Sequence, residues 1–208
     1  MFLINPYIYA TDAWSNLKSI SFDGVDEIVN IGDIAILDSV SIYSVSLWMK
    51  TPSLASLGVI IGKRTTASTT NWNINIQSDG SLGHSIQAAA AKTAASTISI
   101  NTWYHIVVTY NGAAGAANRV QLYVDGVSSL DSVTGTLPSI TINNSHAQYI
   151  GARNVSDSSI DFPFTGNIDE VGIFDYTLTS GEVTALYNSG CPNDLMTLAA
   201  AKRPEHYY

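Results

Sequence analysis

The stretch that decides the fold is Phe164-Thr-Gly-Asn-Ile-Asp-Glu-Val-Gly-Ile-Phe-Asp-Tyr176, in which the apolar residues Ile168, Val171 and Ile173 predict a strand. A matching segment lies far upstream, at Ser21-Phe-Asp-Gly-Val-Asp-Glu-Ile-Val29. We expect these two segments to hold the closing and opening strands of one sheet and to pair with each other. The residues between them would then fold as one cooperative unit.

A short helix is predicted directly after the closing strand, in Leu178-Thr-Ser-Gly-Glu-Val-Thr-Ala-Leu-Tyr187. Thr179 and Glu182 have the spacing of a capping box, in which a hydroxyl and a carboxylate each accept a hydrogen bond from a backbone N–H that the helix leaves unpaired. Gly190 is expected to end the helix in a left-handed conformation.

The chain between these ends carries short alternating apolar runs separated by turn residues, which is the pattern of a β-sandwich. Asp79-Gly80 and Asp125-Gly126 indicate type I′ hairpin turns. The Ala-rich segment 88–95 would favour a helix by propensity alone, but its place between strands predicts a loop or a strand edge. The predicted strands are 19–22, 27–31, 43–51, 58–63, 72–78, 82–88, 96–100, 103–110, 119–125, 127–130, 147–153 and 164–175.

Five blocks of this sequence resemble, in family order, the laminin-G-like part of the concanavalin A-like lectin/glucanase superfamily. They are Phe22-Asp-Gly-Val-Asp26, Ser44-Val-Ser-Leu-Trp-Met-Lys50, Trp103-Tyr-His-Ile-Val-Val-Thr-Tyr110, Val120-Gln-Leu-Tyr-Val-Asp-Gly126 and Gly166-Asn-Ile-Asp-Glu-Val171. The resemblance implies an all-β fold, a jelly-roll β-sandwich of two antiparallel sheets with a short C-terminal helix. It implies a fold far more than a function, because this family is defined by its fold.

Composition narrows the class of protein. Charged residues make up 12% of the 208 residues, about half the usual share for globular proteins, so Ser, Thr and Asn must supply much of the polar surface, as in extracellular or virion β-proteins. The net charge of −8 argues against a nucleic-acid partner, which needs a basic face. The single cysteine, Cys191, excludes an intrachain disulfide.

Targeting signals are also missing from the sequence. No segment is long enough for a membrane span, and the first residues lack a basic leader and the apolar run of a signal peptide. We therefore expect assembly in the cytoplasm, unless the true precursor starts further upstream.

Three regions are predicted along the chain. Residues 1–18 form an irregular arm, 19–190 the sandwich, and 191–208 a tail with a helix ending before Pro204. The arm would either fold over its own domain or anchor the protein on a partner; the anchoring residues are Phe2, Tyr7, Tyr9 and Trp14. The aromatic end, Glu205-His-Tyr-Tyr208, suggests a segment that docks elsewhere or a sequence that continues.

Catalytic motifs are not apparent in the sequence. Glycanases need two carboxylates aimed into one groove, whereas Asp169 and Glu170 are adjacent and are expected to face opposite sides of their strand. His105 is interpreted as a hydrogen-bonded core histidine rather than a base. The sequence therefore predicts a protein that is not an enzyme.

A structural calcium ion is one predicted cofactor. The resemblance implies that Asp169, on the closing strand, lies beside the turn formed by Asp23, Gly24 and Asp26, because related sandwiches often tie their first and last strands with calcium. Carboxylate and carbonyl oxygens are the ligands that Ca²⁺ prefers. The alternative is that these aspartates only shape a turn and cap backbone N–H groups.

Glycans are the predicted small ligands, since sugar sites combine an aromatic ring with amide, carboxylate or guanidinium groups. Trp72 is the leading candidate for the ring; its alternative role is that of an ordinary strand residue. The other candidates are Arg64, Asn71, Asn73, His84, Asn118, Arg119, Arg153 and Asn154.

Together these features predict a non-catalytic structural or recognition protein displayed on a surface. The more specific prediction is a virion component, a capsid decoration or tail protein, that is oligomeric in its assembly and has other structural proteins as partners. The alternative is a glycan-binding lectin module of a cell-surface or secreted protein. The aromatic segments at both ends favour the first.

Overall fold

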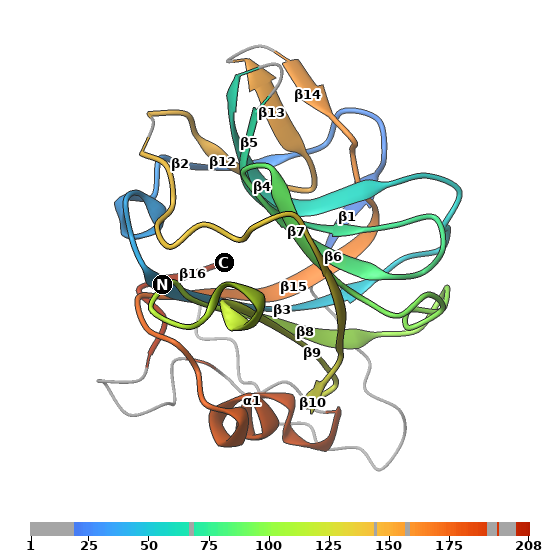
Figure 1. Cartoon of the computed structure of the whole chain (residues 1–208). Coiled ribbons are helices and arrows are strands. Elements are labelled where there is room, and N and C mark those ends of the chain that lie inside the picture. Colours follow the sequence, from blue (N-terminus) through green and yellow to red (C-terminus); the bar gives the residue numbers. More distant parts are fainter. Residues whose placement is uncertain (1–18, 67–68, 144, 157–158, 191–194, 196–202) are drawn as a thin grey trace, which may run out of the picture.

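The predicted opening and closing strands pair with each other in the computed structural model (Figure 1). The structure describes residues 19–66, 69–143, 145–156, 159–190, 195 and 203–208, and only the backbone at 64–66, 69–70 and 154–156. Strand β1 (Ile20–Asp23) lies antiparallel to β15 (Thr165–Phe174), with Ile20 opposite Ile168. The prediction of this pairing is confirmed.

One sheet has the order β1-β15-β3-β8-β9-β10, and β16 pairs with β15 beside β1. We call it sheet A. Its remaining strands are β3 (Ile42–Lys50), β8 (Tyr104–Asn111), β9 (Val120–Val124), β10 (Val127–Ser128) and β16 (His206–Tyr207).

The facing sheet, sheet B, has the order β11-β7-β6-β5-β4-β12-β2. Its strands are β2 (Val29–Gly32), β4 (Gly58–Thr66), β5 (Thr69–Ile76), β6 (Leu82–Ile86), β7 (Ala89–Thr93), β11 (Leu130–Thr134) and β12 (Gln148–Ile150). A separate hairpin of β13 (Arg153–Ser156) and β14 (Ser159–Asp161) stands at one end of this sheet, near β4 and β5 (Figure 1).

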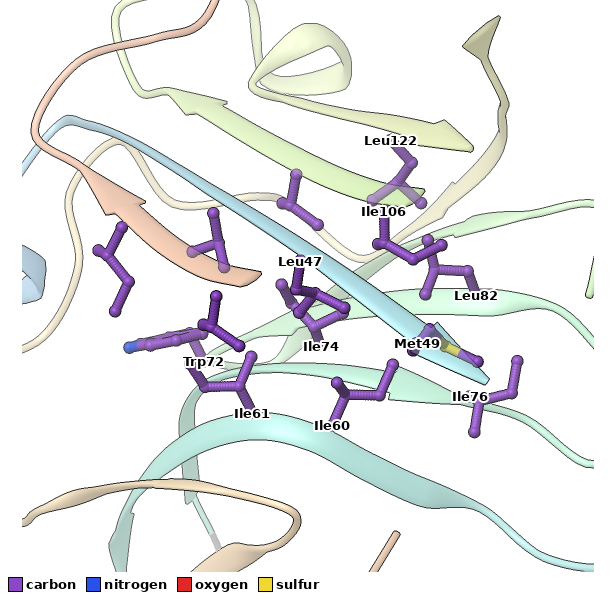
Figure 2. Packing of buried hydrophobic residues seen from close by; sticks show 14 of the residues in the cluster. Leu47, Met49, Ile60, Ile61, Trp72, Ile74, Ile76, Leu82, Ile106 and Leu122 are labelled. Carbon is purple, nitrogen blue, oxygen red and sulfur yellow. The ribbon is translucent and has the colours of Figure 1, made fainter. Parts of the chain in front are cut away.

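The main core fills the space between the two sheets. Leu47 and Met49 of sheet A lie there with Ile60, Ile74 and Ile76 of sheet B (Figure 2), and all five are at most 2% exposed. Each fully buried aliphatic side chain contributes about 1.5–3 kcal/mol to folding. Alternate residues of each strand point into this core, which is why the alternating pattern was readable from the sequence.

A second, smaller core lies on the outer face of sheet A, beneath helix α1 (Ser180–Tyr187). The predicted capping box is confirmed, because the Thr179 side chain accepts from the Glu182 N–H and the Glu182 carboxylate accepts from the Thr179 N–H at 2.8 Å. The predicted helix stop is wrong by two residues. Asn188, with φ +46°, takes the left-handed position, which asparagine tolerates better than most residues.

Strand β15 contains a bulge that changes which residues share a face. Asp169 lies opposite Trp48, but Gly172 lies opposite Ser46, so β15 has one extra residue here, and Glu170 has φ +52°. This bulge allows Ile168 and Val171 both to enter the main core although they are three residues apart. Asp169 and Glu170 consequently both lie on the outer side, and the prediction that they face opposite sides is wrong.

Two other segment predictions need correction. Segment 96–100 is not a strand, because the N–H groups of Ser96 and Ile98 donate to the carbonyls of Asp79 and Gly80 rather than to a neighbouring strand. The Ala-rich segment forms β7, an interior strand of sheet B between β6 and β11.

One of the two hairpin-turn predictions is confirmed and the other is wrong. Asp125 (φ +50°) and Gly126 (φ +78°) form the predicted turn, whereas at the other site only Gly80 has a positive φ, so that turn is not of type I′.

The end of the chain also departs from its prediction. Instead of docking elsewhere, His206 and Tyr207 form β16 on the edge of β15, and the Tyr207 hydroxyl donates to Glu170. The predicted helix of the tail lies almost wholly outside the described residues, as do Cys191 and the arm with Phe2, Tyr7, Tyr9 and Trp14.

Candidate functional site

An arginine, a carboxylate and an exposed aromatic ring meet at the base of the β13–β14 hairpin. Arg153 lies opposite Asp161 in register, and its Nε and Nη2 donate to the two carboxylate oxygens at 2.8 and 2.9 Å. Such a bidentate pair fixes the guanidinium plane as well as its charge. The Arg153 side chain is only 12% exposed.

Phe162 completes this corner. Its ring is 44% exposed, and the Arg153 guanidinium lies 5.0 Å from the ring centroid, within the range of a cation–π contact. Its backbone has φ +50°, which is unusual for a bulky residue and especially before a proline, where extended backbone is preferred. Strain of this kind persists where the surroundings enforce it and gathers at functional sites.

The strained backbone is held in place from both sides. The Val59 N–H donates to the Phe162 carbonyl at 2.8 Å, and Pro163 forms a bridge with Val59. Two residues further on, Phe164 is 1% exposed and packs edge-on against Phe22 with 6.4 Å between ring centroids. The chain thus turns from an exposed ring to a core ring within three residues, which keeps Phe162 at the surface.

A shallow, mostly polar depression of about 20 Å³ adjoins the corner through Pro163. A volume of this order holds about one water molecule. Its lining consists of Thr51, Ser53, Ala55, Ser56, Gly58, Ile76, Pro163, Phe164 and Thr165. We call Arg153, Asp161, Phe162 and this depression the Arg153–Phe162 site.

Of the predicted glycan residues, Trp72 is placed worst for a ligand. It is fully buried in the main core, 6.2 Å from Tyr43 between ring centroids, so its assignment as a stacking platform is wrong. His84 is buried beside it, bonded to the Tyr43 hydroxyl at 2.8 Å and to the Asn73 carbonyl at 3.0 Å. Burial lowers the pKa of His84 to about 4.

The predicted asparagines of β5 lie on the outer side of sheet B but are also buried. Asn71 donates to the Ile142 carbonyl at 3.0 Å, and Asn75 donates to Asn73 at 2.5 Å. Asn73 packs against Gly62, where an added Cβ would come within 2.7 Å of the Asn73 Cβ. At most 2% of Asn71 and Asn73 is exposed, so Asn71 holds the Ile142 segment and Asn73 bonds along the strand to Asn75, and neither forms a ligand surface.

The remaining predicted glycan residues lie in different parts of the fold. Arg119 donates to the carbonyls of Gly112, Ala114 and Leu137 and so fastens two loops, while Asn118 is exposed beside it. Arg64 and Asn154 lie in strands, but their side chains are outside the described part of the structure. Arg153 is therefore the predicted residue that the structure places in the candidate site.

The aspartates predicted to bind calcium do not converge. Asp23 lies opposite Thr165, and Asp169 is four residues further along β15, about 13 Å at the usual rise per residue. Asp23 instead accepts from the Val25 N–H at 2.8 Å, and Gly24 (φ +82°) packs on Thr165, so the turn-shaping alternative describes their contacts.

Metal ligands do not gather elsewhere in the described residues either, where no group of three or more His, Cys, Asp or Glu side chains is placed to hold a metal ion. Calcium binding at the Asp23–Asp26 turn stays a prediction. A lower melting temperature in a chelating buffer than in calcium would support it.

His105 and Asp169 lie together on the outer face of sheet A, on either side of Trp48. As predicted, His105 is buried and hydrogen-bonded: its Nε2 lies 2.9 Å from the Ser46 hydroxyl, and its ring is tilted against Trp48 and stacks on Tyr187. Burial lowers the pKa of His105 to about 3 and raises that of Asp169 to about 6. Burial thus shifts both groups toward their neutral forms.

Asp161 and Phe162 were not found by sequence reasoning. The available signal was Phe162-Pro-Phe164, in which a proline separates two aromatic residues after an acidic one. One of the two rings was expected to be buried in the core, but the sequence pattern alone does not show which of them stays exposed.

Comparison with known proteins places this fold in a family. The model of the concanavalin A-like lectin/glucanases superfamily matches residues 23–184. A search of curated proteins finds no match. Among the described residues, no helix has the length and apolar character needed to cross a membrane.

Solved structures with the same fold include three sugar-related or oligomeric proteins. The heptameric SAP-like pentraxin of Limulus polyphemus has 18% identity and a TM-score of 0.64, with 81% of each chain covered. A putative carbohydrate binding protein of Bacteroides ovatus has 15% identity and a TM-score of 0.66 over 91% of this chain, which spans about half (52%) of that protein.

The third is the CBM40 of a Ruminococcus gnavus sialidase, solved with α2,3-sialyllactose. It has 12% identity and a TM-score of 0.60, with 82% of this chain and 98% of that chain covered. At these identities the structures show the fold alone. Because the family model covers most of the sequence, from the first strand into helix α1, the chain belongs to the concanavalin A-like lectin/glucanase superfamily.

Proposed function

We propose that this protein is a non-catalytic glycan-binding module and that the Arg153–Phe162 site is where it binds. The observation that carries the proposal is the exposed Phe162 ring, held in a strained backbone against a buried, paired arginine. The family and the sugar-binding names of two structural neighbours support the ligand class.

The chemistry of the site suits a sugar. The C–H face of a pyranose is apolar and packs on an aromatic ring, while its hydroxyls need donors and acceptors that are already oriented. Phe162 offers the ring, and the Arg153–Asp161 pair fixes a guanidinium and a carboxylate beside it. Because these groups are ordered before binding, little conformational entropy is lost when a ligand arrives.

Binding is tested on a glycan array, followed by calorimetry with the best ligand. We expect F162A and R153M each to weaken binding about tenfold or more, which corresponds to about 1.4 kcal/mol. I140A removes an equally exposed apolar side chain outside the site and should leave affinity unchanged. Equal loss in all three variants, or full binding by F162A, would place the ligand elsewhere.

Display on a virion is the more specific form of this proposal. It is supported by the aromatic arm and the low content of charged residues. Left exposed, such an arm would be an apolar patch prone to association, and against a partner it would serve as an anchor.

Removal of residues 1–18 tests the anchoring role. Loss of assembly at an unchanged melting temperature would support it. A much lower melting temperature of the isolated protein would mean instead that the arm belongs to the fold.

A further inference from the structure

A lysine amine and two carboxylates are enclosed together at one end of the main core, away from the Arg153–Phe162 site. Lys63 of β4 is 0% exposed, and its Nζ lies 2.5 Å from Asp33 Oδ1 and 2.8 and 3.0 Å from the two oxygens of Asp38. The side chain of Asp38 is 7% exposed, that of Asp33 39%. Both aspartates belong to the segment between β2 and β3.

The surroundings of this group are apolar and tightly packed. Lys63 lies opposite Trp72, and Ile34 and Leu37, which flank the aspartates in sequence, are at most 2% exposed. Moving an ammonium and a carboxylate out of water is costly even when they pair. Burial accordingly raises the pKa of Asp38, although Lys63 opposes this shift. The site therefore shifts Asp38 toward its neutral acid, the form that an amine attacks.

We propose that Lys63 and Asp38 form an intramolecular isopeptide bond, with Asp33 moving the proton. Because both oxygens of Asp38 lie within 3.0 Å of Nζ, the carboxyl carbon between them is in contact with the nitrogen. Reacting atoms held about 3–3.5 Å apart are in the range where proximity replaces a collision between separate molecules.

The reaction balances without any further reactant. The Asp33 carboxylate takes a proton from the Lys63 ammonium, and the free amine attacks Cγ of protonated Asp38. Asp33 passes this proton to one hydroxyl of the tetrahedral intermediate, which leaves as water, and then takes the second proton from the nitrogen and releases it to solvent. An ammonium and a carboxylic acid become one amide, one water molecule and one proton, and nothing is oxidised or reduced.

The two aspartates have different surroundings, which assigns their roles. Asp38 is the more buried and burial raises its pKa, so we assign it as the carboxyl group that the amine attacks. Asp33 reaches solvent and can exchange its proton, and the water released by condensation can leave on its side.

A buried donor lies on the strand next to Lys63. Gln148 precedes Tyr149, the partner of Gly62, and so lies next to Lys63 across the β4–β12 pair. It is 0% exposed, its Oε1 accepts from the Ile34 N–H at 2.7 Å, and its Nε2 has no hydrogen-bond partner among the described residues. A buried donor without a partner costs about 1–3 kcal/mol, and the carbonyl oxygen of the new amide is an acceptor that it could serve.

The decisive measurement is the mass of the purified chain under denaturing conditions. We expect it to fall below the sequence mass by one water molecule. Because the Asp-Gly pairs at Asp23, Asp79 and Asp125 can also lose water by closing a succinimide, the site is located by tryptic mapping. Trypsin does not cleave after an acylated lysine, so peptide 19–50 should appear joined to peptide 51–64 instead of as separate peptides 19–50 and 51–63.

Three variants and one control refine the test. K63M and D38A should have full sequence mass. D33N should form the linkage at least tenfold more slowly than the wild type and should therefore accumulate unlinked chain. K92M removes an exposed lysine of β7 and should keep the branched peptide. A wild-type chain of full mass without the branched peptide would overturn the proposal and leave Lys63, Asp33 and Asp38 as an ion-pair cluster. Complete linkage in D33N would overturn the role given to Asp33.

Discussion

Burial shifts the pKa of both Asp169 and His105, with opposite effects on how the stability of the protein depends on pH. They lie in one row across sheet A, on either side of Trp48. The pKa of Asp169 is raised and that of His105 is lowered, in both cases by desolvation. Stability should therefore depend on pH in two ways that partly cancel between about pH 4 and pH 6.5.

For Asp169, the folded-state pKa of about 6 lies above its ordinary value of 3.8. The folded protein holds this proton more tightly than the unfolded chain, so stability falls as pH rises from about 4 to 6. D169N keeps the oxygen that accepts from the Glu170 N–H and removes the charge. We expect D169N to be more stable than the wild type by about 1 kcal/mol at pH 7, after allowance for solvent screening, and equal to it at pH 4. Denaturant titrations at both pH values measure this difference, and an equal gain at both would mean that the charge is not the cause.

For His105, the folded-state pKa of about 3 lies below its ordinary value of 6.5. The unfolded chain takes up this proton first, so stability falls as pH is lowered below 6.5, by up to about 1.4 kcal/mol per pH unit. H105Q loses packing at every pH, but its stability should decline less steeply between pH 6.5 and 4. Parallel curves for H105Q and wild type would contradict this account.

At the scale of single residues, sequence reasoning predicted burial better than it predicted exposure. It interpreted His105 correctly because apolar neighbours surround it in a strand. It selected Trp72 because a tryptophan between two asparagines looks like a sugar site, and it did not consider Phe162. Which face of β5 is covered depends on the facing sheet, and that contact is not written in the residues next to Trp72.

Helix α1 is the element whose local sequence determines it most completely. Thr179 and Glu182 bond to each other's backbone N–H groups as the spacing predicts. T179A should lower the free energy of unfolding by about 1 kcal/mol, since a capping hydroxyl is worth about that amount. S180A changes an exposed residue of the same turn and serves as the control, with an expected effect within about 0.5 kcal/mol. Chemical denaturation of both variants gives the comparison, and equal losses would contradict the capping role.

Strands β7 and β16 show the limits at the scale of elements. Alanine has a strong helical preference, but β7 is held as a strand by pairing with β6 and β11, and its Ala89 and Ala91 lie in the main core. Strand β16 has two residues, too few for any alternation, and it exists because β15 has a free edge beyond β1. Both depend on partners distant in sequence.

At the scale of the whole molecule, β15 joins strands that lie far apart in the sequence. It pairs with β1 and β3 from the first quarter of the chain and with β16 from its end. A chain cut after residue 160 loses this strand and should not retain a partly folded sandwich. Near-ultraviolet circular dichroism and thermal melting should show no cooperative transition, and a fragment with a sharp melt would disprove this dependence.

The fold was predictable from the sequence because five separated blocks had to fit one arrangement of strands. The site was not, because its members come from a two-stranded hairpin whose position is set by contacts with β4. Arg153 was identified by its chemistry. Its partner Asp161 and the ring of Phe162 were not, because only the folded hairpin brings them next to Arg153.

The shared edge of β15 has a consequence for how the module can be built into larger proteins. Ile20 lies opposite Ile168 and Tyr208 bonds to Val171, so the start of β1 and Tyr208 lie three positions apart on the same edge of β15. A unit with adjoining entry and exit can be spliced into a surface loop of a host without forcing the host's strands apart. It can equally be joined end to end and reopened elsewhere, as a circular permutant with a short linker from Tyr208 to Ile20.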